Sequence, residues 1–203
     1  MEEKETINML SSLKHKIFPR PFERLGVNGK NLIGAEIGVY KGEHAESLLE
    51  KLSVKKLYLI DPYDFYDEYY EGKKHYGVDQ DTLGSAEKEA QKRLKKYSDK
   101  TTWVKKMSAD ALRDIPDNLD FVYIDGNHQY EFIAKDIKNY YPKIKSGGVL
   151  GGHDMYNGFC SEHSGVVQAV AEFVVRNNLQ LYVELPDWWV IKGEKFAGKI
   201  KNC

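Results

Sequence analysis

The sequence is short of cysteine and of long apolar runs, and each shortage excludes a class of protein. Its two cysteines, Cys160 and Cys203, make no disulfide framework, and no paired Cys/His spacing predicts a zinc site. No stretch approaches the roughly 18 apolar residues of a membrane-spanning helix. Residues 1–18 are highly charged and lack the apolar core of a signal peptide. We therefore expect a cytoplasmic protein.

The sequence also has little net charge. Its 30 basic and 31 acidic side chains leave a formal charge of -1. Proteins that bind nucleic acids or anionic membranes usually present an excess of basic residues, which this chain lacks. We therefore expect neither nucleic acid nor membrane as a partner.

The length of 203 residues suits one domain with a substantial core. Apolar residues at helical spacing within 4–18 predict a short amphipathic helix, after which Pro19 and Pro21 enforce an extended segment. We expect an N-terminal helical arm, a main domain and a C-terminal tail, with the boundaries 1–30, 31–195 and 196–203. The arm could serve a homodimer.

Within the main domain, strand and helix patterns alternate. Short apolar runs predict strands at 32–38, 57–60, 101–104, 119–125, 149–152, 179–183 and 188–191. Helical spacing predicts helices at 45–52, 82–97, 109–115, 132–141 and 166–174, with Gly147 and Gly148 as the exit of the fourth. This alternation predicts a doubly wound α/β sheet. The last two strands are too close for a parallel crossover, so we expect an antiparallel hairpin.

A glycine turn follows the first predicted strand. Open α/β sheets bind ligands at the carboxyl ends of their strands, and Gly38 and Gly42 let the backbone approach a ligand there. Tyr40 breaks the Gly-x-Gly-x-x-Gly pattern of dinucleotide sites, and Glu36 would repel a pyrophosphate. The turn therefore favours a positively charged cofactor over NAD.

Asp61 ends the second predicted strand, about 20 residues after the glycine turn. An acid at this place accepts hydrogen bonds from ribose hydroxyls in nucleoside-binding α/β folds. Asp61 could instead have a structural role at the start of a turn, because Asp-Pro often begins a turn. The glycine turn at the matching distance favours the ribose-binding role.

These motifs resemble those of the class I S-adenosylmethionine (SAM)-dependent methyltransferases, most closely the small sugar and macrolide O-methyltransferases of the methyltransferase domain 24 type. The match extends over residues 32–193 and follows the order of the family's motifs. Its later motifs match residues 107–110, 121–130 and 141–154. The resemblance implies a seven-stranded Rossmann-like sheet of order 3-2-1-4-5-7-6, with the seventh strand antiparallel. This agrees with the hairpin expected from the strand spacing.

The resemblance also implies site residues. It assigns contacts with SAM to eight residues, namely Glu36, Gly38, Tyr40, Gly42, Asp61, Ser108, Ala109 and Asp125. In metal-dependent relatives, acids that match Asp125 and the pair His153 and Asp154 hold Mg²⁺. Carboxylates suit Mg²⁺, and an imidazole widens the choice to another divalent cation. Without metal, His128 or His153 would be the general base, and Asp125 would also be catalytic.

Each of these polar residues also has a purely structural interpretation. Asp125 could cap the following helix through its short side chain, and Asn127 could do the same. His153 could be a buried histidine that donates to a backbone carbonyl. Three polar positions that converge at neighbouring strand ends favour the functional interpretation.

Two segments are rich in aromatic residues. Residues 63–80 form a long connection rich in tyrosine and acid, which we expect to be a lid or acceptor-binding loop, or else a surface insertion. Trp188 and Trp189 are expected to pack in the core and the hairpin.

The expected function is thus SAM-dependent O-methylation of a small-molecule acceptor such as a sugar or natural-product hydroxyl. Two alternatives stay open: an N-methyltransferase, and a SAM- or nucleotide-binding module without catalysis. Asp61-Pro62-Tyr63 resembles a nucleic-acid amino-methyltransferase signature, but that signature belongs after the fourth strand. The acceptor itself is set by loops whose sequence carries no transferable code.

Overall fold

A computed structural model describes residues 22, 29–64, 79–155 and 164–198 of the chain. The strands are β1 (Leu32–Ile37), β2 (Val54–Ile60), β3 (Thr101–Val104), β4 (Leu119–Ile124), β5 (Ile144–Gly152), β6 (Leu179–Glu184) and β7 (Asp187–Lys195). The helices are α3 (Glu43–Lys51), α4 (Gln80–Leu94), α5 (Ser108–Ala111), α6 (Tyr130–Tyr140) and α7 (Ser164–Asn177), with a 3₁₀ turn, η3 (Lys95–Tyr97), after α4.

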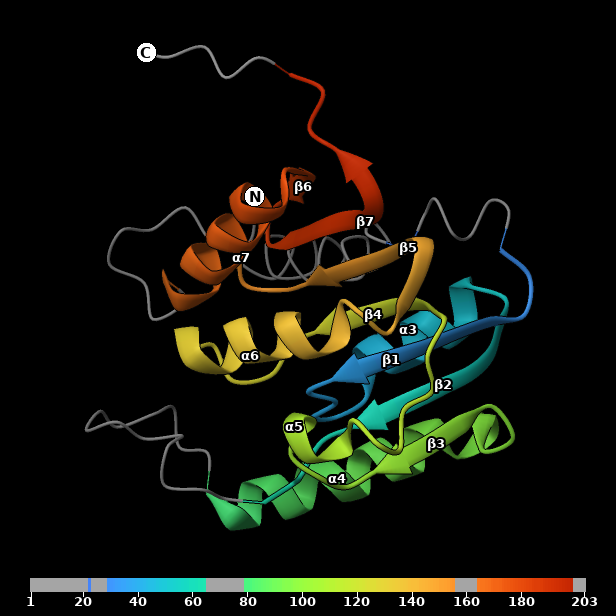
Figure 1. Cartoon of the computed structure of the whole chain (residues 1–203). Helices are drawn as coiled ribbons and strands as arrows, with labels where there is room; N and C mark the ends of the chain where they lie inside the picture. Colours follow the sequence, from blue (N-terminus) through green and yellow to red (C-terminus); the bar gives the residue numbers. More distant parts are fainter. Residues whose placement is uncertain (1–21, 23–28, 65–78, 156–163, 199–203) are drawn as a thin grey trace, which may run out of the picture.

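The strands form a seven-stranded sheet of order β3-β2-β1-β4-β5-β7-β6, which confirms the predicted topology (Figure 1). The pairs from β3 to β5 are parallel. β7 runs antiparallel to both β5 and β6, so the expected hairpin is present. The strand order changes direction at β1: β2 and β3 lie on one side of it, and after β3 the chain returns to place β4 on its other side. Ligands of open α/β sheets bind at such a reversal, outside the carboxyl ends of the strands.

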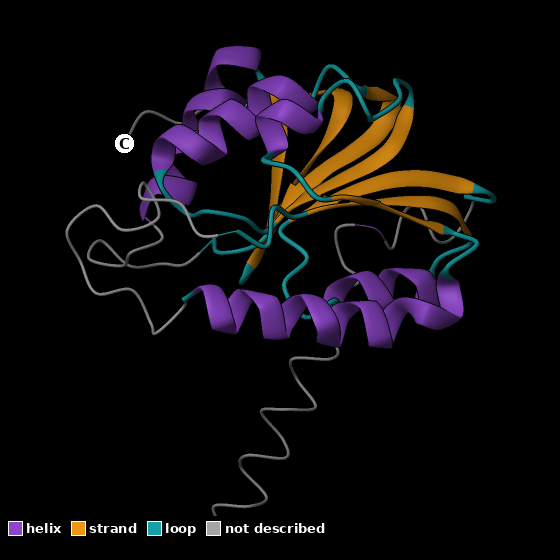
Figure 2. Cartoon of the chain, turned by 90° about the horizontal axis from the view of Figure 1, so that it is seen from below, coloured by secondary structure: helices purple, strands orange, loops and turns teal. Residues whose placement is uncertain are grey.

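Helices cover both faces of the sheet (Figure 2). Successive strand residues point to opposite faces, so each strand contributes to two hydrophobic clusters. Ala35 and Ile37 of β1 belong to the cluster that includes residues of α5, α6 and α7. Leu57 and Leu59 of β2 belong to the other, which includes residues of α3 and α4. The two clusters form a three-layer core that holds the strand ends in place.

The fifth strand departs from the sequence prediction. Gly147 and Gly148 do not end a helix; they lie inside β5, which begins earlier, at Ile144. The pairing with β4 is irregular here, since Leu119 pairs with Ile144 but Phe121 pairs with Val149. A Cβ on Gly148 would lie 2.7 Å from the carbonyl oxygen of Asp120. The glycines therefore permit an irregular, closely packed strand start, a use that glycine has within sheets.

The structure bears on the remaining predictions for the helix after β3, the two tryptophans and the N-terminal segment. α5 is shorter than the predicted helix at 109–115. Trp188 is buried and Trp189 stacks on Tyr182 of the hairpin, as expected. The predicted helix at 4–18 lies outside the described residues, as do residues 65–78 of the expected lid. Phe22 is buried, with its ring centroid 4.8 Å from that of Phe121. Within the described part of the chain, no helix is long and apolar enough to cross a membrane.

Candidate functional site

The glycine turn after β1 packs directly against the end of β4. Gly38 has a φ of 84°, in the left-handed region that favours glycine. A Cβ at this position would lie 2.0 Å from the carbonyl oxygen of Asp125. Gly42, also left-handed with a φ of 73°, is the N-cap of α3. Gly38 thus lets the turn pack on the end of β4, and Gly42 lets it pack on α4, where a Cβ would lie 3.1 Å from Leu94 Cδ1.

Asp61, at the end of β2, holds the glycine turn through its side chain. Its Oδ2 accepts hydrogen bonds from the backbone N–H groups of Val39 and Tyr40, each at 2.9 Å. Its Oδ1 accepts one from Tyr63 N, also at 2.9 Å. Burial raises the pKa of the Asp61 carboxyl, although these three bonds favour its charged form. Asp61 therefore fixes the shape of the turn, and its predicted contact with a ribose stays a prediction.

Glu36 lies deeper than its place in the motif suggests. Its side chain is only 1% exposed, on the α3 face of the sheet. Oε1 lies 3.3 Å from His44 Nδ1, and Oε2 has no hydrogen-bond partner among the described residues. Burial raises the pKa of Glu36, and the nearby His44 counteracts this. A buried carboxylate oxygen without a partner, next to the turn, suits a cationic ligand group such as the SAM ammonium or sulfonium.

His44 was not singled out by the sequence analysis. It lies in the first turn of α3, and its ring stacks on Tyr123 of β4 at a centroid distance of 3.9 Å. The only sequence signal was a histidine two residues after the last glycine of the turn. Since most single histidines in a helix are structural, this signal could not have identified a partner of Glu36.

A polar cluster lies at the carboxyl ends of β4 and β5, next to the glycine turn. One ligand atom each from Asp125, His128 and Asp154 lies within 4.8 Å of the others. His128 Nε2 lies 2.7 Å from Asp154 Oδ2. Asn127 Oδ1 accepts a hydrogen bond from Gln129 N at 2.9 Å, so Asn127 makes the local turn at the start of α6. Asp125 does not cap α6, whose N-cap is Gln129, and its carboxylate belongs to the polar cluster.

His153 lies on the other side of Asp154. Its Nδ1 is 3.1 Å from Asp154 Oδ1 and 3.9 Å from Asp125 Oδ1. Burial opposes its charged form, but the hydrogen bond to Asp154 and the charge of Asp125 raise its pKa to about 9. The pKa of His128 is also raised, because its bond to Asp154 outweighs burial. These same bonds hold the pKa of Asp154 well below its usual range despite burial, whereas burial raises the pKa of Asp125.

The donor set of the cluster fits a divalent cation. Two carboxylates and an imidazole converge from neighbouring strand ends, and such mixed oxygen and nitrogen sites bind Mg²⁺, Mn²⁺ or related ions. The group of ligand atoms within 4.8 Å of one another contains His128, which the sequence assigned to catalysis, and the expected role of His153 as a metal ligand stays a prediction. In the structure His153 bonds to Asp154.

The region after β3 is held by α6. The Ser108 hydroxyl donates to Asp136 Oδ1, and the Tyr140 hydroxyl donates to the backbone oxygen of Ser108 at 2.6 Å. Burial raises the pKa of Asp136 to about 6, against the effect of the Ser108 bond. Ser108 and Ala109 are both partly exposed at the start of α5, and their predicted contact with SAM stays a prediction. Asp136 and Tyr140 were not identified from the sequence.

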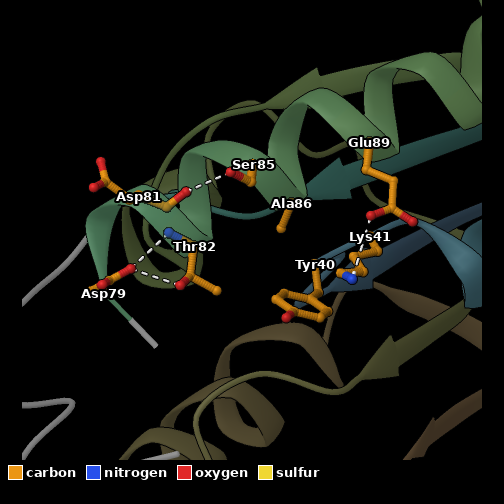
Figure 3. Close-up of a pocket in the computed structure, with 8 residues that line it drawn as sticks. All are labelled: Tyr40, Lys41, Asp79, Asp81, Thr82, Ser85, Ala86 and Glu89. Carbon is orange, nitrogen blue, oxygen red and sulfur yellow. Dashed lines mark hydrogen bonds and ion pairs between the residues drawn. The ribbon is translucent and has the colours of Figure 1, made fainter. Parts of the chain in front are cut away.

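A polar hollow of about 370 Å³ lies between the glycine turn and α4 (Figure 3). It is lined by Tyr40, Lys41, Asp79, Asp81, Thr82, Ser85, Ala86 and Glu89. Lys41 is paired with Glu89 at 3.4 Å, and Asp79 accepts from the backbone and hydroxyl of Thr82. The Tyr40 side chain, 45% exposed, forms the wall nearest to the turn. The hollow thus offers hydroxyls, carboxylates and one aromatic ring beside the predicted cofactor site.

Comparison with solved structures identifies proteins of similar fold. The O-methyltransferase NovP superposes with a TM-score of 0.64 at 18% identity, over 88% of this chain and 79% of NovP. The calicheamicin methyltransferase CalS11 gives 0.60 at 11% identity, over 95% and 81%. MycE, solved with Mg, SAH and mycinamycin VI, gives 0.55 at 17% identity, over 89% of this chain but 49% of MycE. At these identities the likeness shows the fold.

The family assignment comes from the sequence itself. The model of a methyltransferase domain family matches residues 35–155, which include the glycine turn, Asp61 and the polar cluster. No curated protein sequence matched the chain. Because the family match covers more than half of the chain and agrees with the fold and the motifs, the chain belongs to this methyltransferase family and is a class I SAM-dependent methyltransferase.

Proposed function

We propose that the chain transfers the methyl group of SAM to a hydroxyl oxygen of a small-molecule acceptor, with a divalent cation held by Asp125, His128 and Asp154. The observation that carries the proposal is the convergence of ligand atoms from these three residues within 4.8 Å at the ends of β4 and β5. A cation at this place would lower the pKa of an acceptor hydroxyl and orient it. The O-methyltransferase NovP, which has a similar fold, supports an oxygen acceptor, and the methyltransferase MycE, solved with Mg and SAH, supports a divalent cation.

Bound SAM supplies an activated methyl group, so the protein mainly has to position the acceptor and to exclude competing nucleophiles. On this proposal the glycine turn and Asp61 bind the cofactor at the ends of β1 and β2. Asp125 lies between the two sites, because its carbonyl oxygen packs on Gly38 and its carboxylate belongs to the polar cluster. The acceptor oxygen would therefore meet the methyl group next to Asp125.

His153 has a supporting role in this proposal. Its bond to Asp154 Oδ1 leaves Oδ2 directed to His128, so the two histidines together fix the orientation of one carboxylate. In the alternative without metal, His128 or His153 would accept the proton of the acceptor hydroxyl directly.

The test is methyl transfer from labelled SAM to a panel of sugars, phenols and amines, with Mg²⁺ or Mn²⁺ and with a chelator. We expect transfer to a hydroxyl that the chelator abolishes and added metal restores. Asp154→Asn should reduce turnover at least 100-fold while SAH affinity stays within threefold, a loss of the size seen when metal ligation or its support fails. Asp99→Asn, which changes an exposed acid outside the family motifs, is the matched control.

The other outcomes are equally informative. Transfer that the chelator does not affect would reject the cation and leave the histidine-base mechanism. Transfer to amines alone would reject the oxygen acceptor. Tight SAM binding without transfer to any class of acceptor would favour the binding-module alternative.

A further inference from the structure

Asp154 has an unusual backbone for a residue with a side chain. Its φ is 65°, in the left-handed region. Residues other than glycine persist there only when the surrounding structure holds them, and such residues gather at functional sites. The Asp154 side chain is 7% exposed and meets both histidines. A change of its backbone conformation would therefore move the carboxylate away from them.

The two neighbours of Asp154 are held from opposite sides. His153 N donates to the carbonyl oxygen of Ile124, the last residue of β4, at 3.1 Å. Met155 N donates to the carbonyl oxygen of Pro186 at 2.9 Å. Pro186 belongs to the turn between β6 and β7, so this hairpin, not only the parallel sheet, fixes the Asp154 segment.

The hairpin turn is itself anchored in the core. Asp187, the residue after Pro186, is 0% exposed. Its Oδ1 accepts a hydrogen bond of 2.8 Å from the hydroxyl of Tyr123, a fully buried residue of β4. Its Oδ2 has no hydrogen-bond partner among the described residues. A buried carboxylate is unfavourable unless it is well paired, so its presence here suggests a role beyond filling space.

The same geometry places Asp187 beside the polar cluster. β7 pairs antiparallel with β5, with Trp188 opposite Gly152. The next positions along the two strands are Asp187 and His153, so the start of β7 adjoins the segment that carries Asp154. The bond from Tyr123 therefore links β4 to the turn that holds this segment from the side of β7.

We propose that Tyr123 and Asp187 are positioning residues for Asp154: their hydrogen bond fixes the β6–β7 turn so that Pro186 holds Met155, and thereby keeps the Asp154 carboxylate directed at the cation site. The inference rests on the proposed function, since it assumes that Asp125, His128 and Asp154 bind a divalent cation. It adds a buried pair outside the three residues proposed to bind the cation. Partners of this kind around metal ligands commonly change metal affinity 10- to 100-fold when removed.

The test is the affinity of the full chain for Mn²⁺, measured from the signal of free Mn²⁺ in electron paramagnetic resonance. Tyr123→Phe removes the hydroxyl alone and should weaken Mn²⁺ binding about tenfold. Asp187→Asn keeps an acceptor oxygen and should stay within threefold of the wild type. Tyr182→Phe, which removes another tyrosine hydroxyl bond in the same hairpin, to Glu194, is the matched control and should not change Mn²⁺ affinity.

A second readout separates positioning from general stability. SAH affinity by calorimetry should be unchanged in Tyr123→Phe, and hydrogen exchange at Met155 should become faster. If Tyr123→Phe does not fold, Asp187→Ser, whose side chain is too short to reach Tyr123, takes its place with the same expected results. A lower Tm with unchanged Mn²⁺ affinity would overturn the positioning role alone. A wild-type chain that binds no Mn²⁺ would overturn the proposed cation site, and the inference with it.

Discussion

A Cβ atom on Gly38 would lie 2.0 Å from the carbonyl oxygen of Asp125, so the turn after β1 can approach the end of β4 only with glycine at this place. Gly38→Ala must move one of two backbone segments and must also adopt a φ of 84°. We expect it to destabilise the protein by about 3 kcal/mol and to abolish measurable SAH binding. Chemical denaturation and calorimetry check the two effects.

Gly84→Ala is the control for this substitution. Gly84 lies within α4, and a Cβ there would meet no atom within 4 Å. Alanine in an open helical position should raise the free energy of unfolding by about 1 kcal/mol and leave SAH affinity unchanged. Equal effects of the two substitutions would contradict the role given to the Gly38 contact.

Asp61 tests the second half of the cofactor site. Asp61→Asn replaces one acceptor oxygen with a donor, which cannot serve the N–H groups of Val39 and Tyr40 together with that of Tyr63. We expect SAH affinity to fall tenfold or more, since hydrogen bonds to a charged group contribute about 1.5–3 kcal/mol. Calorimetric titration measures the loss. Asp64→Asn, at a neighbouring exposed acid, should bind SAH normally, and a normal Asp61→Asn would reject Asp61 as part of the site.

The fold was predictable from the sequence because local patterns determine it. Apolar runs and helical spacing marked the strands and most helices, and the short gap before Trp188 required a hairpin. Gly147 and Gly148 show the limit of this reasoning. A glycine pair is typical of a helix end when only the sequence is considered, whereas the need for Gly148 in β5 comes from the close approach of Asp120 in the neighbouring strand.

The candidate site was predictable where its residues follow strand ends, and not where they face one another across the sheet. Asp125 and Asp154 follow β4 and β5, so their proximity could be inferred from topology. The contact of His44 with Tyr123 and the hydrogen bond of Tyr123 to Asp187 depend on how the strands pair and how α3 packs on the sheet. The spacing of these residues in the sequence reveals neither. The same holds for the position of His128 beside Asp154.

Glu36 provides a test of the charge of the cofactor. Glu36→Gln keeps the size of a side chain that is 1% exposed and removes its charge. SAM carries a sulfonium charge that SAH lacks, so we expect SAM affinity to fall about tenfold and SAH affinity to fall less, by the Coulomb energy of partly buried charges. Glu43→Gln, at an exposed acid in the first turn of α3, is the control. An equal loss for both ligands would reject a contact with the sulfonium and leave the ammonium, which SAM and SAH share, or the packing of His44 as the role of Glu36.

Asp136 gives the stability of the protein a defined pH dependence. Burial raises its pKa to about 6, from a usual value of 3.8, so the folded state binds a proton that the unfolded state has lost between these pH values. A group that binds more protons in the folded state makes the free energy of unfolding fall as pH rises, here from pH 4 to pH 6. Above pH 6 the accumulated loss is about 3 kcal/mol, at about 1.4 kcal/mol for each pKa unit.

Asp136→Asn removes this titration and keeps an oxygen that can accept the hydroxyl bond of Ser108. Urea unfolding at pH 4.5 and pH 7.5 should therefore show a smaller decrease in the variant than in the wild type, and the variant should be the more stable of the two at pH 7.5. Asp99→Asn, at an exposed position, should follow the wild-type profile. Parallel profiles of wild type and Asp136→Asn would mean that the carboxyl is already ionised in the folded protein near pH 4, so that water or a bound cation must stabilise it beside Ser108.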